Sequence, residues 1–238
     1  MAMRSVWITG AGSGIGRAMA LRFAQEGAVV TLTGRRRAPL DEVAGAVARA
    51  GGKARVDPAD VLDRDALAAL VDALVAETDA LDVVANNAGV NIAERHWAQH
   101  DAASWDRLLD INVKGALNVV AAALPPMRAQ GGGLILNTAS WAGRFYSTVS
   151  GVAYGASKHA LMSINASLNA EEGAHGIRAT ALCPAEVATP LLRDRPNYSE
   201  ALAAQAIQPE DLAETAVHVA KLPARLAVHE IVVAPVRR

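Results

Sequence analysis

The sequence predicts an α/β protein built on one doubly wound parallel sheet with helices on both faces. Short β-branched runs alternate with longer segments of helical periodicity along the 238 residues, and this alternation is typical of right-handed βαβ units. A glycine-rich turn follows the first run, and no repeat or linker divides the chain. We therefore expect a single domain, residues 1–238, that binds its ligand beyond the carboxyl ends of the strands.

The expected elements follow from a period of two in strands and of 3.6 in helices. Strands are expected at residues 6–9, 29–33, 54–57, 82–85, 134–138, 178–183 and 230–233. Helices are expected at residues 15–26, 40–50, 64–77, 102–127 and 153–172. The less regular stretch of about residues 185–208 contains Pro190 and Pro196. It is expected to be a loop with short helices that covers the substrate.

Composition narrows the classes of function. Hydrophobic residues make up 52% of the chain and the formal net charge is -1, so a core can form but no basic field favours nucleic acid or a membrane surface. No apolar run reaches the roughly 18 residues of a membrane span, and the glycine turn interrupts the only stretch that could begin a signal peptide. Cys183, the single cysteine, is interpreted as a buried strand residue. We expect a cytoplasmic protein with a small-molecule partner and no metal site.

Residues 9–16, Thr-Gly-Ala-Gly-Ser-Gly-Ile-Gly, form the glycine-rich turn between the first expected strand and the first expected helix. Glycines allow a tight turn and a close backbone approach, while the N–H groups and dipole at a helix start favour a phosphate. Such a turn can also simply join a strand to a helix. Its position after the first strand of an α/β chain favours a dinucleotide site.

Further motifs follow in order, and together with the turn they resemble the short-chain dehydrogenase/reductase family. These motifs are Asp60-Val61, Asn86-Asn87-Ala88-Gly89, Ser140, and Tyr154-Gly155-Ala156-Ser157-Lys158. The resemblance covers Val6 to about Thr189, nearly the whole chain. It implies a Rossmann-type fold and an oxidoreductase that moves a hydride between a nicotinamide cofactor and a carbonyl or secondary alcohol carbon.

Tyr154 and Lys158 are four residues apart at an expected helix start, so both side chains lie on one face. A phenol with a pKa near 10 is a poor base at neutral pH, but a nearby ammonium lowers that pKa, and Tyr154 is the expected general acid/base. The resemblance implies that Lys158 also binds the nicotinamide ribose, that Ser140 donates to the substrate oxygen, and that Asn112 holds a helix distortion. Because Ser140 lies one residue further from Tyr154 than is usual in the family, Thr138 is the alternative for its role.

The resemblance places the cofactor contacts at the carboxyl ends of the strands. They are Gly10, Ser13, Gly14, Ile15, Gly16, Asp60, Val61, Asn87, Ala88, Gly89, Tyr154, Lys158, Pro184, Val187 and Thr189. Asp60 is expected to receive the adenine amino group, Asn87 to pack against a ribose, and Thr189 to bind the carboxamide. Ala185 stands where the family usually has glycine.

The end of the second expected strand predicts which dinucleotide is bound. An NAD site places a carboxylate there to accept from the ribose 2′-OH, whereas this chain has Gly34 followed by Arg35 and Arg36. These arginines can pair with the 2′-phosphate of NADP, although a solvated arginine turn is the alternative. Ser13 occupies a position that is often basic in NADP-preferring relatives. We expect NADP(H) to be preferred and NAD(H) to be possible.

An aromatic cluster close to Tyr154 is the main clue to the substrate. Trp141, Phe145 and Tyr146 lie in a loop that lines the pocket in the family, so a partly apolar ketone or alcohol is expected. Trp141 and Phe145 could instead be core or oligomer contacts. Glu186 is a candidate for binding a substrate amine or hydroxyl, and Arg144 is either a carboxylate ligand or a solvated side chain.

The C-terminal sequence suggests a subgroup of the family, and the assembly that is common in the family suggests an oligomer. Residues 222–235 resemble a subgroup of broad-specificity NADP-linked reductases and hydroxy-acid or serine dehydrogenases. Family members commonly form homotetramers through the helices that carry Asn112 and Tyr154, so a homo-oligomer, dimer or tetramer, is expected. Two rival hypotheses remain: an NAD-preferring alcohol dehydrogenase with the same site, and a cofactor-binding regulator that has lost turnover.

Overall fold

The structure, a computed structural model, describes residues 3–236 and contains one seven-stranded parallel sheet. The strands are β1 (Ser5–Thr9), β2 (Val29–Thr33), β3 (Lys53–Val56), β4 (Val83–Asn86), β5 (Gly133–Thr138), β6 (Ile177–Pro184) and β7 (Glu230–Val233). Their order in the sheet is β3-β2-β1-β4-β5-β6-β7. The direction of winding reverses between β1 and β4, which is the topological switch point of a doubly wound sheet. The predicted Rossmann-type fold is confirmed.

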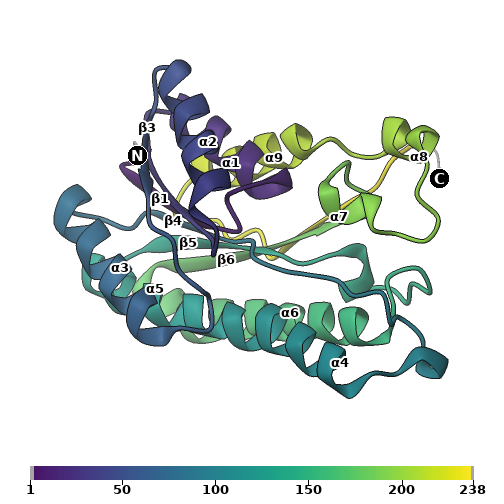
Figure 1. Ribbon diagram of the computed structural model, residues 1–238. Coiled ribbons are helices and arrows are strands. Elements are labelled where there is room, and N and C mark those ends of the chain that lie inside the picture. Colours follow the sequence, from purple (N-terminus) through teal and green to yellow (C-terminus); the bar gives the residue numbers. More distant parts are fainter. Residues whose placement is uncertain (1–2, 237–238) are drawn as a thin grey trace.

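Helices cover both faces of the sheet (Figure 1). One layer contains α1 (Gly14–Gln25), α2 (Arg37–Arg49) and α9 (Pro209–Lys221). The other layer contains α3 (Arg64–Thr78), α4 (Ala102–Leu109), α5 (Ala116–Gln130) and α6 (Val152–Glu171). Two short helices, α7 (Pro190–Arg193) and α8 (Glu200–Gln205), follow β6 within the stretch that the sequence analysis expected to be irregular.

The alternation of side chains along β1 shows how the two layers are held. Val6 and Ile8 pack with Phe23 in the core beneath α1, whereas Trp7 joins Leu67 in the core on the opposite face. All five residues of β1 are buried, as expected for a central parallel strand covered by helices on both sides. The carboxyl end of β1 is thereby fixed between two packed layers, and the glycine turn leaves from this point.

Helix α9 was missed by the sequence analysis, which assigned no helix to residues 209–221. Pro209 occupies its first turn, and Gln208 and Asp211 cap it reciprocally. This pattern is a helix start signal. The helix packs on α1, and an ion pair between Arg22 and Glu214 joins the two.

Two expected helix boundaries also differ from the structure. Helix α2 begins at Arg37 rather than at residue 40, because Pro39 is compatible with a first helical turn, where its missing N–H is not needed. The run expected at residues 102–127 extends to Gln130, and a π-helical segment, η2 (Asp110–Gly115), separates α4 from α5. By length and composition the run Ala102–Gln130 could cross a membrane, but half of its most apolar window is buried inside the molecule, as in many core helices of soluble proteins.

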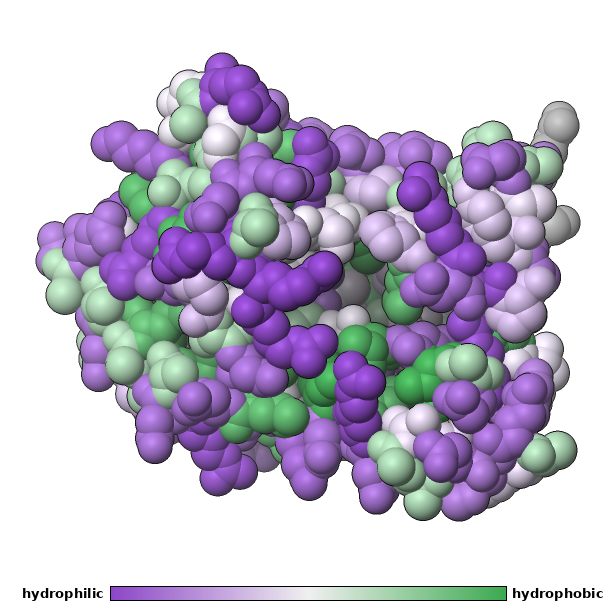
Figure 2. Space-filling view, viewed as in Figure 1, coloured by the Kyte–Doolittle hydropathy of each residue, from purple (hydrophilic) through white to green (hydrophobic). Residues whose placement is uncertain are grey.

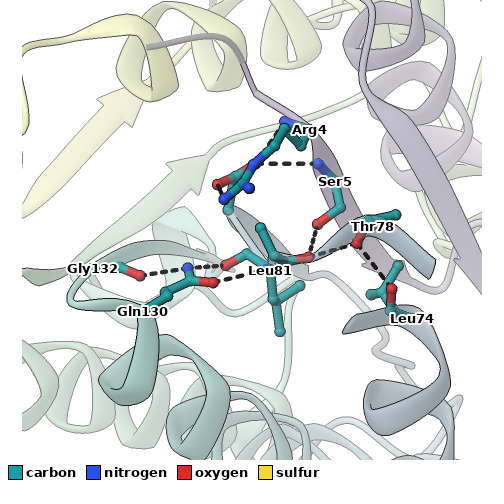
Figure 3. Close-up of polar contacts among 9 residues, drawn as sticks. Arg4, Ser5, Leu74, Thr78, Leu81, Gln130 and Gly132 are labelled. Carbon is teal, nitrogen blue, oxygen red and sulfur yellow. Dashed lines mark hydrogen bonds and ion pairs between the residues drawn. The ribbon is translucent and has the colours of Figure 1, made fainter. Parts of the chain in front are cut away.

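Hydrogen bonds connect chain segments at the amino ends of the strands (Figure 3). Gln130, the last residue of α5, accepts from the N–H of Leu81 at 3.0 Å and donates to its carbonyl at 2.8 Å. Thr78, the last residue of α3, donates to Leu74 O at 2.9 Å, and Asp82 accepts from Arg4 N at 2.6 Å. These contacts join the chain segments before β1 and β4 to the ends of two helices. The groove that contains the predicted site residues lies at the opposite edge of the sheet.

Candidate active site

A groove at the carboxyl ends of the strands consists of two adjoining cavities that share Gly10, Ser13 and Gly89. The first cavity is lined by Ser140, Tyr154, Lys158, Thr189 and their neighbours, and the second by Gly34, Arg35, Arg36, Asp60, Val61 and their neighbours. The space-filling view shows a hollow in this face with hydrophobic side chains along its lower edge (Figure 2). The groove therefore crosses the switch point and passes over the glycine turn.

The glycine turn is shaped by backbone that other residues adopt rarely. Gly10 and Gly14 have φ angles of 64° and 51°, in the left-handed region that favours glycine. A Cβ on Gly16 would lie 2.3 Å from the Gly10 carbonyl oxygen, so no side chain fits there. Ser13 precedes α1 without a capping hydrogen bond from its side chain. The first N–H groups of α1 thus remain available to an anion in the groove.

The end of β4 is tied to this turn. The N–H groups of Asn87 and Ala88 both donate to Thr9 Oγ1 at 3.0 Å, and Asn87 Nδ2 donates to Thr9 O at 3.2 Å. These bonds hold Asn87 at the base of the turn. A Cβ on Gly89 would lie 3.5 Å from Lys158 Nζ, so this residue lies directly beside the lysine.

Lys158 is buried, with 4% of its surface exposed. Its Nζ donates to Thr138 O at 2.8 Å and lies 5.5 Å from the centroid of the Tyr154 ring. Burial lowers the pKa of Lys158 to about 8, because removal from water disfavours the ammonium form. The spacing of four residues at the start of α6 therefore brings the two side chains together, as the sequence analysis expected.

Two opposing influences act on the Tyr154 phenol. Burial raises its pKa, whereas a hydrogen bond with Ser140 and the positive charges of Arg195 and Arg95 lower it. Ser140 caps the short 3₁₀ helix η3 (Trp141–Gly143), where its Oγ accepts from Ala142 N at 3.1 Å. Its hydroxyl proton can therefore point toward the phenol or a substrate oxygen. Neither arginine was singled out by the sequence analysis.

Thr138, the alternative to Ser140, differs from it in accessibility. Its Oγ1 is enclosed by protein and has no hydrogen-bond partner among the described residues. Its carbonyl oxygen accepts the hydrogen bond from Lys158 Nζ. An enclosed hydroxyl cannot reach a substrate without movement of β5. The geometry therefore favours Ser140 for the contact with a substrate oxygen.

Asn112 lies in the π-helical segment η2 and is 1% exposed. Its Oδ1 accepts from Val90 N at 2.8 Å, and its Nδ2 donates to Val90 O at 2.9 Å and to Ser157 Oγ at 3.1 Å. The side chain thus joins the loop after β4 to α6. A helix distortion occurs at this position, as the resemblance implied.

At the other end of the groove, Arg35 and Arg36 follow β2. Among residues 3–236 neither forms an ion pair, whereas Arg37 pairs with Asp41 at 3.6 Å on the exposed face of α2. Asp60 lines the same cavity, and its Oδ1 accepts from Leu62 N at 3.0 Å. This end of the groove thus has two guanidinium groups without an ion pair among the described residues, and position 34 carries a glycine instead of a carboxylate. A negatively charged ligand group is therefore favoured here.

The end of β6 and the segment that follows it complete the first cavity with Pro184, Val187 and Thr189. A Cβ on Gly14 would lie 3.0 Å from Thr189 Cγ2, so Thr189 faces the turn directly. The N–H of Ala185 donates to Val233 O at 2.8 Å, and alanine thus continues the pairing with β7. The replacement of the usual glycine by Ala185 leaves this backbone in regular pairing.

A family model described as short chain dehydrogenase matches residues 4–199. The chain belongs to the short-chain dehydrogenase family. It is 31% identical over 229 residues to an uncharacterized oxidoreductase of Staphylococcus epidermidis, with 96% of each chain covered.

Two solved structures that are similar to this chain contain different cofactors. A metagenomic short-chain oxidoreductase in complex with NADP is 30% identical, with a TM-score of 0.84 and coverage of 99% of this chain and 98% of the other. A 3-oxoacyl-[acyl-carrier protein] reductase with bound NAD from Brucella melitensis is 31% identical, with a TM-score of 0.85 and coverage of 97% and 89%. Likeness of fold therefore does not select between the two dinucleotides.

This short-chain dehydrogenase contains a further cavity, which adjoins the first at Ser140, Ala185 and Arg195. Trp141, Tyr146 and Glu186, expected at the substrate, line this cavity. Phe145 lies outside the lining, packed on Trp141 with 4.3 Å between ring centroids. Arg144 pairs with Glu230 at 3.3 Å, so its guanidinium is engaged away from the cavity.

Other sequence-based expectations concern metals and the cysteine. Within residues 3–236 no group of three or more His, Cys, Asp or Glu side chains could hold a metal ion. Cys183 is buried in β6, and burial raises its pKa to about 11, so it remains a neutral thiol at physiological pH. The residues that the sequence analysis missed are Arg95 and Arg195, which no local motif marks.

Proposed function

We propose that this protein is an NADP(H)-dependent oxidoreductase that transfers a hydride between the nicotinamide ring and a carbonyl or secondary alcohol carbon. The observation that carries the proposal is the placement of Ser140, Tyr154 and Lys158 around one cavity, at one end of a groove whose other end is basic. A hydride acceptor bound at the first end would lie beside a hydroxyl donor and a phenol that can give up a proton.

The residues present fit a dinucleotide. The uncapped start of α1 offers N–H groups to a pyrophosphate, and the glycine turn leaves room that a Cβ at Gly16 would fill. Arg35 and Arg36 can pair with a 2′-phosphate through planar, charge-assisted contacts, and Gly34 presents no carboxylate to repel it. We infer a preference for NADP(H), with NAD(H) as a possible substitute. When bound, the reduced cofactor supplies the hydride.

The chain itself supplies the proton and the orientation. Ser140 donates a hydrogen bond to the carbonyl oxygen, and Tyr154 delivers its phenolic proton to that oxygen as the carbon receives the hydride, which yields the alcohol. Lys158 uses one of its three N–H donors on Thr138, so two remain for the ribose hydroxyls. In the opposite direction, the Tyr154 phenolate takes the alcohol proton.

The stretch of residues 185–208 is proposed to cover the substrate, because Leu191, Leu192 and Arg195 line the first cavity. The protein is further proposed to be a cytoplasmic homodimer or homotetramer. Light scattering coupled to gel filtration measures the assembly directly, and a monomeric mass at micromolar concentration would contradict this last point.

The function is tested by steady-state turnover of ketones, hydroxy acids and secondary alcohols with both cofactors. We expect a higher kcat/KM with NADPH than with NADH. Tyr154→Phe should bind NADPH normally but lose about 10²- to 10⁴-fold in turnover, the usual contribution of general acid–base catalysis. A higher kcat/KM with NADH supports the NAD-linked alcohol dehydrogenase instead. Cofactor binding without turnover of any substrate supports the non-catalytic regulator.

A further inference from the structure

Two arginines outside the proposed cofactor site act on the proton donor. Arg195, in the loop after α7, lines the cavity that contains Ser140, Tyr154 and Lys158 and also the adjoining cavity with Trp141 and Tyr146. Arg95, in the loop after β4, is 3% exposed. Both charges lower the pKa of Tyr154. Arg195 therefore lies where the two cavities meet beside Ser140, and Arg95 lies within electrostatic range of the same phenol.

Arg95 is a buried cation whose contacts are all to neutral groups. Its Nε, Nη1 and Nη2 donate to the carbonyl oxygens of Ile92, Val149 and Asp194 at 3.0, 2.7 and 3.1 Å. Within residues 3–236 no carboxylate lies within ion-pair distance of it. Burial and the nearby charge of Arg195 both lower its pKa, which means that the two guanidinium groups repel each other. Buried like charges are costly unless an anion joins them.

Arg195 is only partly satisfied by the protein. The single hydrogen bond of its guanidinium group to the described residues runs from Nη1 to Glu186 Oε1 at 3.3 Å, whereas charge-assisted contacts of good geometry are about 2.7–2.9 Å long. The edge formed by Nε and Nη2 makes no hydrogen bond within residues 3–236. That edge matches the two oxygens of a carboxylate. The acidic groups that face the arginine pair are Glu186 and Asp194, and the latter offsets the repulsion on Arg95 in part.

We propose that the substrate carries a carboxylate, which Arg195 binds through its Nε and Nη2 edge while Ser140 and Tyr154 hold the reacting oxygen. The substrate class is then a short oxo acid in one direction and a hydroxy acid in the other. Arg95 is a positioning residue, because its donors are engaged by three backbone carbonyls and its charge acts through space. This inference rests on the proposed function and assigns the substrate class of the same site.

The test uses short α-oxo and β-oxo acids, each compared with its methyl ester, which removes the charge but keeps the reacting carbonyl. The variants are Arg195→Gln and Arg195→Lys. The matched control is Arg225→Gln, because Arg225 is an exposed arginine that lines neither of the two cavities in which Arg195 takes part. The parent enzyme is expected to show a higher kcat/KM for an acid than for its ester. Arg195→Gln should lower kcat/KM for the acid by about 10- to 100-fold, the loss typical of a charged hydrogen-bonding pair, and leave the ester within about threefold.

The remaining outcomes separate this inference from the proposed function. Arg195→Lys should recover part of the preference for the acid, since the charge returns without the planar fork. Equal losses for acid and ester, or a parent enzyme that prefers every ester, overturn the carboxylate assignment while the oxidoreductase assignment stands. Absence of turnover for acids, esters and neutral ketones with either cofactor instead overturns the proposed function. Titration of NADPH by fluorescence shows that each variant is folded.

Discussion

Replacement of Lys158 by methionine is expected to stabilise the cofactor-free protein while it abolishes turnover. The lysine stem is almost fully buried, and its ammonium has one hydrogen-bond acceptor, Thr138 O, among the described residues. Methionine has a similar length and fills the same space without a charge. The substitution therefore removes a buried cation with little change in packing, as when buried ion pairs are replaced by apolar residues.

The magnitude follows from the pKa of this lysine. Burial lowers it from 10.5 to about 8, and a difference of one in pKa corresponds to about 1.4 kcal/mol. The charged form thus costs about 3 kcal/mol of folding free energy at neutral pH. The variant also loses the hydrogen bond to Thr138, which offsets on the order of 1–2 kcal/mol of the stability gained by removing the charge. The net gain of about 1–2 kcal/mol should raise the Tm by about 2–8 °C in a domain of this size.

Calorimetry of parent and Lys158→Met protein across pH checks both the size and the cause. Because the folded-state pKa lies below the unfolded one, the cost of the lysine is complete below about pH 8 and disappears as the pH rises toward 10.5. The stability advantage of the variant should therefore shrink over that interval. A variant that melts below the parent at pH 7, or an advantage independent of pH, would refute the reasoning.

Three further predictions concern the cofactor end of the groove. Arg35→Ala should raise the KM for NADPH at least about tenfold and change that for NADH little, since a charged contact to the 2′-phosphate is lost; Arg37→Ala, which alters an exposed pair on α2, is the control and should change neither. Gly34→Asp should shift the ratio of kcat/KM values toward NADH, and an unchanged ratio would argue against readout at this position. Gly16→Ala places a Cβ 2.3 Å from Gly10 O, so it should weaken binding of both cofactors, as measured by fluorescence titration; unaltered binding would contradict the geometry of the turn.

The sheet and the cofactor groove were predictable because their determinants are local in sequence. Each strand carries its own β-branched run, and the turn of residues 9–16 identifies itself by its glycines. The pair of Tyr154 and Lys158 is likewise local, since a spacing of four on a helix brings two side chains to one face. Helix α9 carried equally local signals in Pro209 and Asp211 and could have been recognised from them.

The substrate side was not predictable in the same way. Arg95 and Arg195 are a hundred residues apart in the chain, and only the fold brings their charges to one phenol. Arg144, which the sequence offered as a carboxylate ligand, pairs instead with Glu230 from β7. The choice between Ser140 and Thr138 also required the structure, because it depends on which hydroxyl is enclosed.

The hydrogen bonds of Arg95 have a consequence for redesign of the enzyme. The Arg95 side chain connects its own loop, at Ile92, to two other loops, at Val149 and Asp194. It does so only through hydrogen bonds to main-chain oxygen atoms. Apart from Asp194, whose charge offsets part of the repulsion on Arg95, side chains in those loops can therefore be exchanged without loss of these hydrogen bonds, provided that the backbone path is kept. A library that randomises residues 145–149 while Arg95 is retained should sample new specificities on a preserved frame, whereas a loop of different length at this position would remove the Val149 carbonyl that Arg95 holds.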